Sequence, residues 1–273
     1  MQNVSHNWQE KIVPIVLITV TLSFVTLFLV LPLVSVFYEA FSRGAAAFFS
    51  SFNDPDAQSA IFLTIVCALV AVPLNVVFGV VAAWCITKFK FWGKNVLITI
   101  IDVPFAISPV IAGLVFILLF GGQTKMGAWL IENGLPIVFS PVGIILATIF
   151  VTIPFVAREL IPLMEEQGTL EEEAAVALGA GGWSIFWLVT LPNIKWGLLY
   201  GIILCNARAM GEFGAVMVVS GQIRGSTTTL PLYIYQMDQS FNAVAAFSLA
   251  TILAGLALVT LIVKSIIEWK VKR

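Results

Sequence analysis

The chain has 273 residues, of which 60% are hydrophobic and 11% are charged, and its formal net charge is −1. Soluble domains are about 45–50% apolar and about 25% charged, so this composition excludes an ordinary soluble domain. The nearly neutral charge balance also gives no reason to expect a nucleic-acid-binding surface.

Six apolar stretches reach the roughly 20 residues that a helix needs to cross a bilayer. They predict transmembrane helices at about Ile12–Phe37, Ile61–Thr87, Val96–Phe120, Val142–Pro162, Leu198–Ser220 and Ala243–Ile267. Ten-residue segments of alternating polarity, which are typical of membrane barrels, are absent from the sequence. The expected fold is therefore an all-α membrane protein with six transmembrane helices.

The lysines and arginines predict how these helices are oriented. With the N-terminus inside, ten of them fall on the cytoplasmic side, while Arg43, Lys125 and Arg224 fall outside. An excess of basic residues marks cytoplasmic loops, so both termini are expected to be cytoplasmic. The outer loops are then Tyr38–Ala60, Gly121–Pro141 and Gly221–Asn242.

The third predicted span contains two prolines, Pro104 and Pro109. Proline removes a backbone donor and bends a helix, and neighbouring helices in a membrane can tolerate the bend. Irregular packing is the simpler interpretation. A kink that shapes a gate is the functional alternative.

The long inner segment before the fifth span is predicted to fold as a polar-edged helical hairpin. Thr169 and Glu172 have the spacing of a capping box, which predicts a helix start. Gly179 is suited to the left-handed conformation that ends a helix. A second short helix is expected at Trp183–Leu188, closed by Pro192.

The fifth span carries two charges, Arg208 and Glu212, four residues apart. This spacing places them on one face of a helix, where they can pair. An intramembrane arginine is costly unless it is paired or wetted. The pair is interpreted either as a buried clamp between helices or subunits, or as a positive waypoint for an anion on the translocation path.

The outer segment Arg224–Pro231 is rich in hydroxyl groups. A solvated polar loop is the simplest interpretation. Hydroxyls and backbone amides can also hold an oxyanion, and the loop can alternatively face an extracytoplasmic binding protein.

No residue pattern predicts catalysis or a metal site. Cys67, Cys85 and Cys205 lie within apolar spans without metal-like spacing, and His6 is the single histidine. The chain also lacks a GxxxxGK[ST] phosphate-binding loop, so no nucleotide site or cofactor is expected.

One sequence pattern in the inner loop resembles the EAA loop of ABC importer permeases. That pattern is EAA, three residues, Gly, nine residues, an aliphatic residue, one residue and Leu-Pro. It is matched by Glu173, Ala174, Ala175, Gly179, Val189, Leu191 and Pro192, with Val189 where isoleucine is usual. The resemblance implies that this loop couples the permease to a separate ATPase subunit.

The run ARAMGEFGAV at residues 207–216 resembles the sulfate and molybdate group of these permeases. Segments 155–164, 191–201 and 219–225 narrow the resemblance to the sulfate/thiosulfate type, the CysW-type subunit. It implies a type I (MetI-like) permease fold in the bacterial cytoplasmic membrane, working by alternating access, and a transport subunit rather than an enzyme. The implied partners are a second homologous permease subunit, two ATP-hydrolysing subunits and an extracytoplasmic sulfate-binding protein.

Two other functions are weighed against sulfate import. A molybdate or tungstate permease shares the run around Arg208, and an ion-coupled secondary transporter would use Arg208 and Glu212 as a relay. Along the chain, residues 1–57 are expected to form the tail, first span and outer loop. Residues 58–268 form the permease core with the EAA loop at 163–195, and residues 269–273 form a short basic tail.

Overall fold

The computed structural model describes residues 3–271, and within that range the chain forms helices and turns without strands. The elements before the inner loop are α1 (Asn3–Val25), η1 (Thr26–Val30), α2 (Leu31–Ala40), α3 (Ala45–Ser50), α4 (Pro55–Lys88), α5 (Lys94–Ala106), α6 (Pro109–Phe120), α7 (Lys125–Glu132), α8 (Pro141–Thr152) and α9 (Pro154–Gln167). The inner loop and the rest of the chain form α10 (Leu170–Ala177), α11 (Gly182–Ile185), η2 (Phe186–Thr190), α12 (Leu191–Met210), α13 (Gly214–Val219), α14 (Leu230–Gln239) and α15 (Ala243–Val271). The two η elements are π-helical turns.

The described part of the chain contains five or six candidate spans, which agrees with the predicted all-helical membrane fold. Five helices are long and apolar enough to cross a membrane, and a sixth span is complete when the bent pair of α5 and α6 is taken as one. The spans are helical because a bilayer accepts only helices or closed barrels, in which the backbone polar groups are hydrogen-bonded internally.

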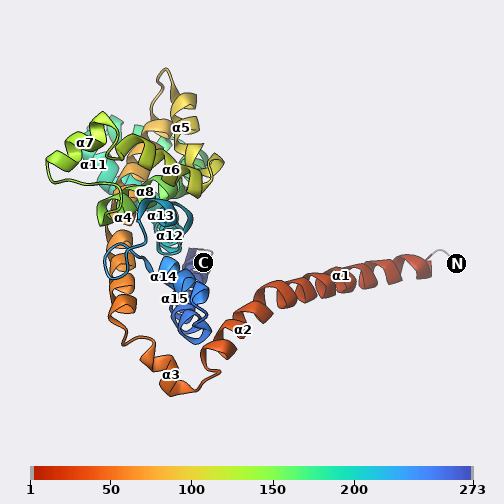
Figure 1. Ribbon diagram of the computed structural model, residues 1–273. Coiled ribbons are helices and arrows are strands. Elements are labelled where there is room, and N and C mark those ends of the chain that lie inside the picture. The colour runs from red at the N-terminus through yellow and green to blue at the C-terminus, as the bar shows by residue number, and fades with distance from the viewer. Residues whose placement is uncertain (1–2, 272–273) are drawn as a thin grey trace.

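The first span stands apart from the other helices. The side chains in its most apolar stretch are all exposed, and Figure 1 shows α1 extending away from the bundle. Only its last part, α2, packs against the bundle, where it contacts α15. Lipid tails are as apolar as these side chains, so a lipid-facing helix loses nothing by its exposure.

Helix α4 lies at the centre of the bundle and packs against α8, α9 and α12. Its closest approach is at Gly79, where an added Cβ would lie 2.6 Å from the Cβ of Val156 on α9. Beside this contact, the buried side chains of Val72, Leu160 and Ile194 form an apolar core. The buried amide of Asn75 donates to the hydroxyl of Thr152 on α8 at 2.6 Å, so α4 also makes a polar contact within the bundle.

The third span is broken rather than kinked, which corrects the expectation of one continuous helix. The chain bends by 107° between α5 and α6, where Ile107 is extended and Ser108 is non-helical, with ψ 135°. Proline disfavours the helical conformation of the residue before it, so Pro109 accounts for the break and then begins α6. Pro104 lies inside α5 without ending it. The gate interpretation remains a prediction.

The loops gather at two opposite ends of the bundle, as the predicted topology requires. At one end, Lys88, the last residue of α4, pairs with Glu172 of α10, and Lys94, the first residue of α5, pairs with Glu165 near the end of α9. At the other end, the hydroxyl of Tyr233 donates to Asp54 at 2.5 Å, which joins the loop before α4 to α14.

Candidate functional site

Helix α10, which carries the EAA residues, lies on the surface of the inner end. None of its side chains is buried, and Glu173 and Ala174 are exposed while Ala175 is half-buried. The neighbouring side chains of Leu178 and Trp183 are also exposed apolar groups. Exposed apolar groups gathered beside a charged helix are typical of a surface that receives a partner.

The start of α10 differs from the predicted capping box. Thr169 makes no capping bond to the backbone; its hydroxyl instead donates to the carboxylate of Glu173 at 2.7 Å. Glu172, the expected partner of Thr169, turns away to pair with Lys88 at 2.9 Å. The prediction of the helix start was right, but its stated cause was wrong because a charged partner distant in sequence attracts Glu172.

The end of α10 follows the sequence prediction. Gly179 has φ +85°, in the left-handed region. The amide of Gly179 donates to the carbonyl of Val176 at 2.9 Å, and the amide of Ala180 donates to the carbonyl of Ala175 at 3.0 Å. This pair of bonds is the Schellman motif, which satisfies the last carbonyls of a helix.

The second arm of the expected hairpin is not a separate short helix. Instead α11 passes through η2 into α12, so the residues from Gly182 onward form the inner part of the fifth span. Pro192 therefore does not close a helix; it lies in the first turn of α12. The wider π turn, in which the amide of Leu191 donates to the carbonyl of Phe186, carries the helix past the proline. Val189 and Leu191 are half-buried along this arm.

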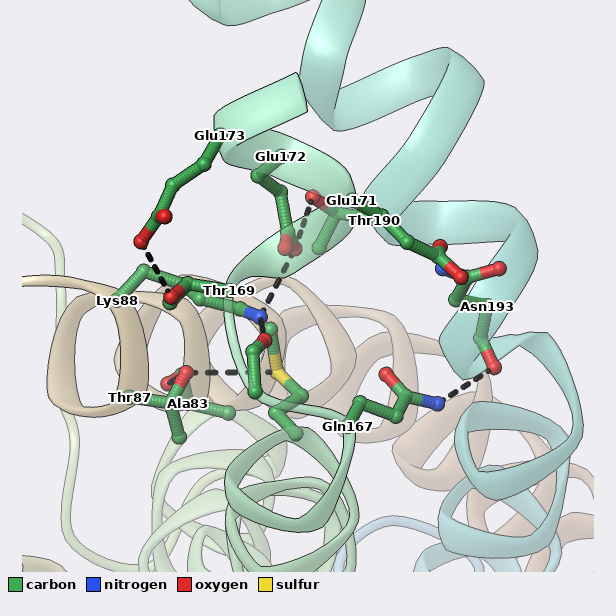
Figure 2. A network of polar contacts seen from close by, with 12 residues as sticks. Ala83, Thr87, Lys88, Gln167, Thr169, Glu171, Glu172, Glu173, Thr190 and Asn193 are labelled. Atoms are coloured by element: carbon green, nitrogen blue, oxygen red, sulfur yellow. Dashed lines mark hydrogen bonds and ion pairs between the residues drawn. The ribbon is translucent and has the colours of Figure 1, made fainter. Parts of the chain in front are cut away.

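A polar network attaches α10 to its surroundings (Figure 2). Glu172 accepts from Lys88 at 2.9 Å and from the hydroxyl of Thr190 at 3.2 Å. Lys88 also donates to the carbonyl of Gly168, in the turn that precedes α10. Sequence reasoning missed this network because Lys88 ends α4 whereas Glu172 lies in α10, and no local pattern links residues so far apart in sequence.

A cytoplasmic pocket of about 390 Å³ opens beside the network. It is lined by Trp84 of α4 and Phe89 just after it, and by Val176 of α10 and Ile185 of α11. The pocket contains no metal-like cluster, and none is found among the described residues.

The charged pair of the fifth span forms as predicted, but not within one continuous helix. Helix α12 ends at Met210, and α13 begins after a three-residue break. Arg208 lies in the last turn of α12, where a helix dipole favours a cation. It pairs with Glu212 in the break, and the other carboxylate oxygen of Glu212 accepts from the amide of Ala215 at 2.9 Å. Glu212 therefore joins the two halves of the span.

The hydroxyl-rich outer loop is exposed at Arg224, Gly225 and Ser226 but is not solvated throughout, and its roles toward an oxyanion or a binding protein remain predictions. Thr227, Thr228 and Thr229 are buried. The hydroxyls of Thr227 and Thr228 hydrogen-bond to the backbone of Ile223, which closes a turn. The solvated-loop interpretation was wrong for these threonines, because the loop folds inward against α4 and α14.

Known proteins resemble this chain over most of its length. Residues 75–273 match the family model described as "Binding-protein-dependent transport system inner membrane component". The chain is 51% identical to the sulfate transport system permease protein CysW of Escherichia coli, over 89% of this chain and 84% of that protein. It is 35% identical to the sulfate transport system permease protein CysT of the same organism, over 88% of this chain and 87% of that protein. Among solved structures, a bacterial alginate ABC transporter in complex with its alginate pentasaccharide-bound periplasmic protein matches with a TM-score of 0.79 and 17% identity, over 100% of this chain and 99% of that chain.

Proposed function

Because the chain belongs to the family of binding-protein-dependent transport system inner membrane components, we propose that it is a permease subunit that imports sulfate, together with thiosulfate. The assignment of sulfate as the cargo rests on the 51% identity of this chain with CysW over most of both chains. The chain itself lacks a phosphate-binding loop, so ATP is hydrolysed by a partner subunit.

The proposed complex contains a second, homologous permease subunit. The 35% identity of this chain with CysT supports this part of the proposal, because it gives an example of such a homologue. Two ATPase subunits bind the inner end, and an extracytoplasmic sulfate-binding protein delivers the anion to the outer end. Transport then follows alternating access, in which ATP binding rearranges the spans between inward-open and outward-open states. Residues 58–268 form the transporting core in this proposal, residues 1–57 form the first span with its flanks, and residues 269–273 form a basic tail whose last two residues lie outside the described range.

Helix α10 is proposed as the contact with the ATPase. Its exposed Glu173 and Ala174 and the half-buried Ala175 allow close approach, and the turn at Gly179 keeps the helix short. Val189, Leu191 and Pro192 then fix the arm that returns to the membrane.

The pair of Arg208 and Glu212 is proposed as a clamp rather than an anion site. Glu212 is almost completely buried and already uses both carboxylate oxygens, one for Arg208 and one for the amide of Ala215. A guanidinium that is paired in this way is largely neutralised toward a passing anion.

The cargo is tested by uptake of labelled sulfate in a strain that lacks this gene and carries it on a plasmid. We expect uptake to return with the plasmid, and to fall when unlabelled thiosulfate is added but not when molybdate is added. Stronger competition by molybdate than by thiosulfate would contradict the proposal and favour a molybdate permease.

The coupling role is tested by Glu173→Lys, which reverses a charge on the proposed contact. Glu166→Lys is the matched control, because it makes the same change at an exposed residue of α9 outside α10. We expect the α10 variant to lose ATPase co-purification and sulfate uptake, and the control to keep both. Equal behaviour of the two variants would refute the coupling role.

A further inference from the structure

Polar contacts, more than apolar packing, determine how α10 is held. The helix has no buried side chain, so burial of apolar surface contributes little to its position. Its anchoring contacts involve Glu171 and Glu172, from its first turn. A displacement of α10 can therefore be passed on only through its chain connections and through these contacts.

The contact between Lys88 and Glu172 differs from the others because it reaches a span that is remote in sequence. The side chain of Glu171 pairs with Asn193, and Thr190 donates to Glu172. Both of these partners belong to the arm that directly follows α10. Lys88, in contrast, is the last residue of α4, 84 positions before Glu172.

The ion pair is also shielded from water. The side chains of Lys88 and Glu172 are 9% and 17% exposed. Another inner ion pair, between Lys94 and Glu165, is 35% and 52% exposed. Exposed pairs contribute little because solvent screens them, whereas removal of one partner from a shielded pair leaves an uncompensated charge. Lys88 is further fixed by the carbonyl of Gly168.

Helix α4 extends this contact across the whole bundle. It continues without a break from Pro55 to Lys88, which corresponds to about 50 Å at the helical rise. At its outer end, Asp54 caps the helix and accepts a hydrogen bond from Tyr233 of α14. Pro73 lies inside α4 without ending it, so one continuous helix joins Lys88 to the outer surface and can carry a movement imposed on Lys88.

We propose that Lys88 and Glu172 form a tether that makes α4 follow the coupling helix α10 when the ATPase moves it. The inference rests on the proposed function, because it assigns these two positioning residues to the coupling of ATP hydrolysis to transport. Neither residue is part of the EAA pattern, and neither contacts the cargo in this proposal.

The test is the number of sulfate ions moved per ATP hydrolysed by the purified complex in proteoliposomes, at equal amounts of assembled complex. We expect Glu172→Gln, which keeps the shape of the side chain, to lower this ratio by about tenfold, in the range of typical coupling energies between sites. Lys88→Arg keeps the charge and the donors, and should retain most of the ratio. Glu165→Gln, in the exposed pair, should leave the ratio unchanged.

An unchanged ratio in Glu172→Gln would overturn the tether, even if total transport and hydrolysis fell together. If the Gln variant does not assemble, the ratio for Lys88→Arg decides the matter, and a tenfold loss of the ratio in that charge-conserving variant would overturn the tether. A second measurement separates the tether from the cargo. It compares the hydrogen exchange of the complex with and without ATP and vanadate. In the wild-type complex the exchange should change in both α10 and residues 80–88, whereas in Glu172→Gln it should change only in α10. Loss of that distinction overturns the tether, whereas absence of sulfate uptake by the wild type overturns only the cargo.

Discussion

The two charges of the fifth span are expected to contribute unequally to stability, and this inequality follows from their burial. The side chain of Glu212 is 1% exposed, whereas that of Arg208 is 30% exposed. Arg208→Met leaves a carboxylate with no counter-charge in an apolar site, and a broken buried pair costs about 3–5 kcal/mol. Glu212→Gln leaves a cation that is only partly enclosed by protein, while the amide oxygen of the new Gln side chain still accepts from the amide of Ala215. Its cost should be about 1–3 kcal/mol, that of one unsatisfied donor.

The double variant Arg208→Met with Glu212→Gln provides the sharpest comparison. It removes the buried charge together with its partner, and replacement of a whole buried pair is often nearly neutral. We therefore expect it to be more stable than Arg208→Met alone. The assay is the thermal midpoint of the purified complex in detergent at one scan rate, because membrane proteins unfold irreversibly and only the rank order is interpreted.

Sulfate uptake by the same variants distinguishes a clamp from an anion site. If the pair is a clamp, uptake by each variant follows the amount of stable complex, and Arg208→Lys retains both. Equal midpoints for the two single variants, or a double variant that is less stable than Arg208→Met, would refute the reasoning from burial. Uptake that disappears in a fully stable double variant would refute the clamp.

Two further substitutions test the packing and the outer end of the bundle. Gly79→Ala should destabilise the chain by about 1–3 kcal/mol, because the new Cβ would lie 2.6 Å from the Cβ of the stiff, β-branched Val156. Gly201→Ala is the control: its Cβ would lie 3.4 Å from the Cα of Val156, and the thermal midpoint should change little. Equal midpoints for these two alanine variants would contradict the packing argument. Burial, followed by the hydrogen bond to Asp54, raises the pKa of Tyr233, so the neutral phenol is the form that the fold stabilises. The stability that the neutral phenol contributes is complete below the unfolded pKa of about 10 and is lost as the pH rises through the folded pKa. The thermal midpoint of the wild type should therefore fall more steeply above about pH 10 than that of Tyr233→Phe. Parallel curves for the two proteins would contradict this expectation.

The spans were predictable from sequence because the bilayer imposes length and composition on every crossing helix. The helix stop at Gly179 was predictable for a similar reason, since a left-handed residue is a local requirement. The glycines Gly197 and Gly201, four residues apart in α12, face Leu163 and Val156 of α9, and this spacing is a local pattern typical of close helix contact.

Features that depend on remote partners were not predictable in this way. The capping box failed because Lys88 of another span draws Glu172 away from the helix start. Pro192 was read as a terminator from local propensity, but the π turn before it lets the helix continue. Glu212 stabilises the break after Met210, because its carboxylate accepts from the amide of Ala215 in the first turn of α13. No rule about the spacing of two residues predicts this bond. The roles of Glu173, Arg208 and Glu212 in transport remain predictions.

The glycine contact gives α12 a mechanical property. The helix has 20 residues, about 30 Å at the helical rise, and Gly197 and Gly201 lie near its middle, facing α9. We expect this contact to act as a pivot of α12. A movement of the inner end in one direction would then move the outer end, at Arg208, in the opposite direction.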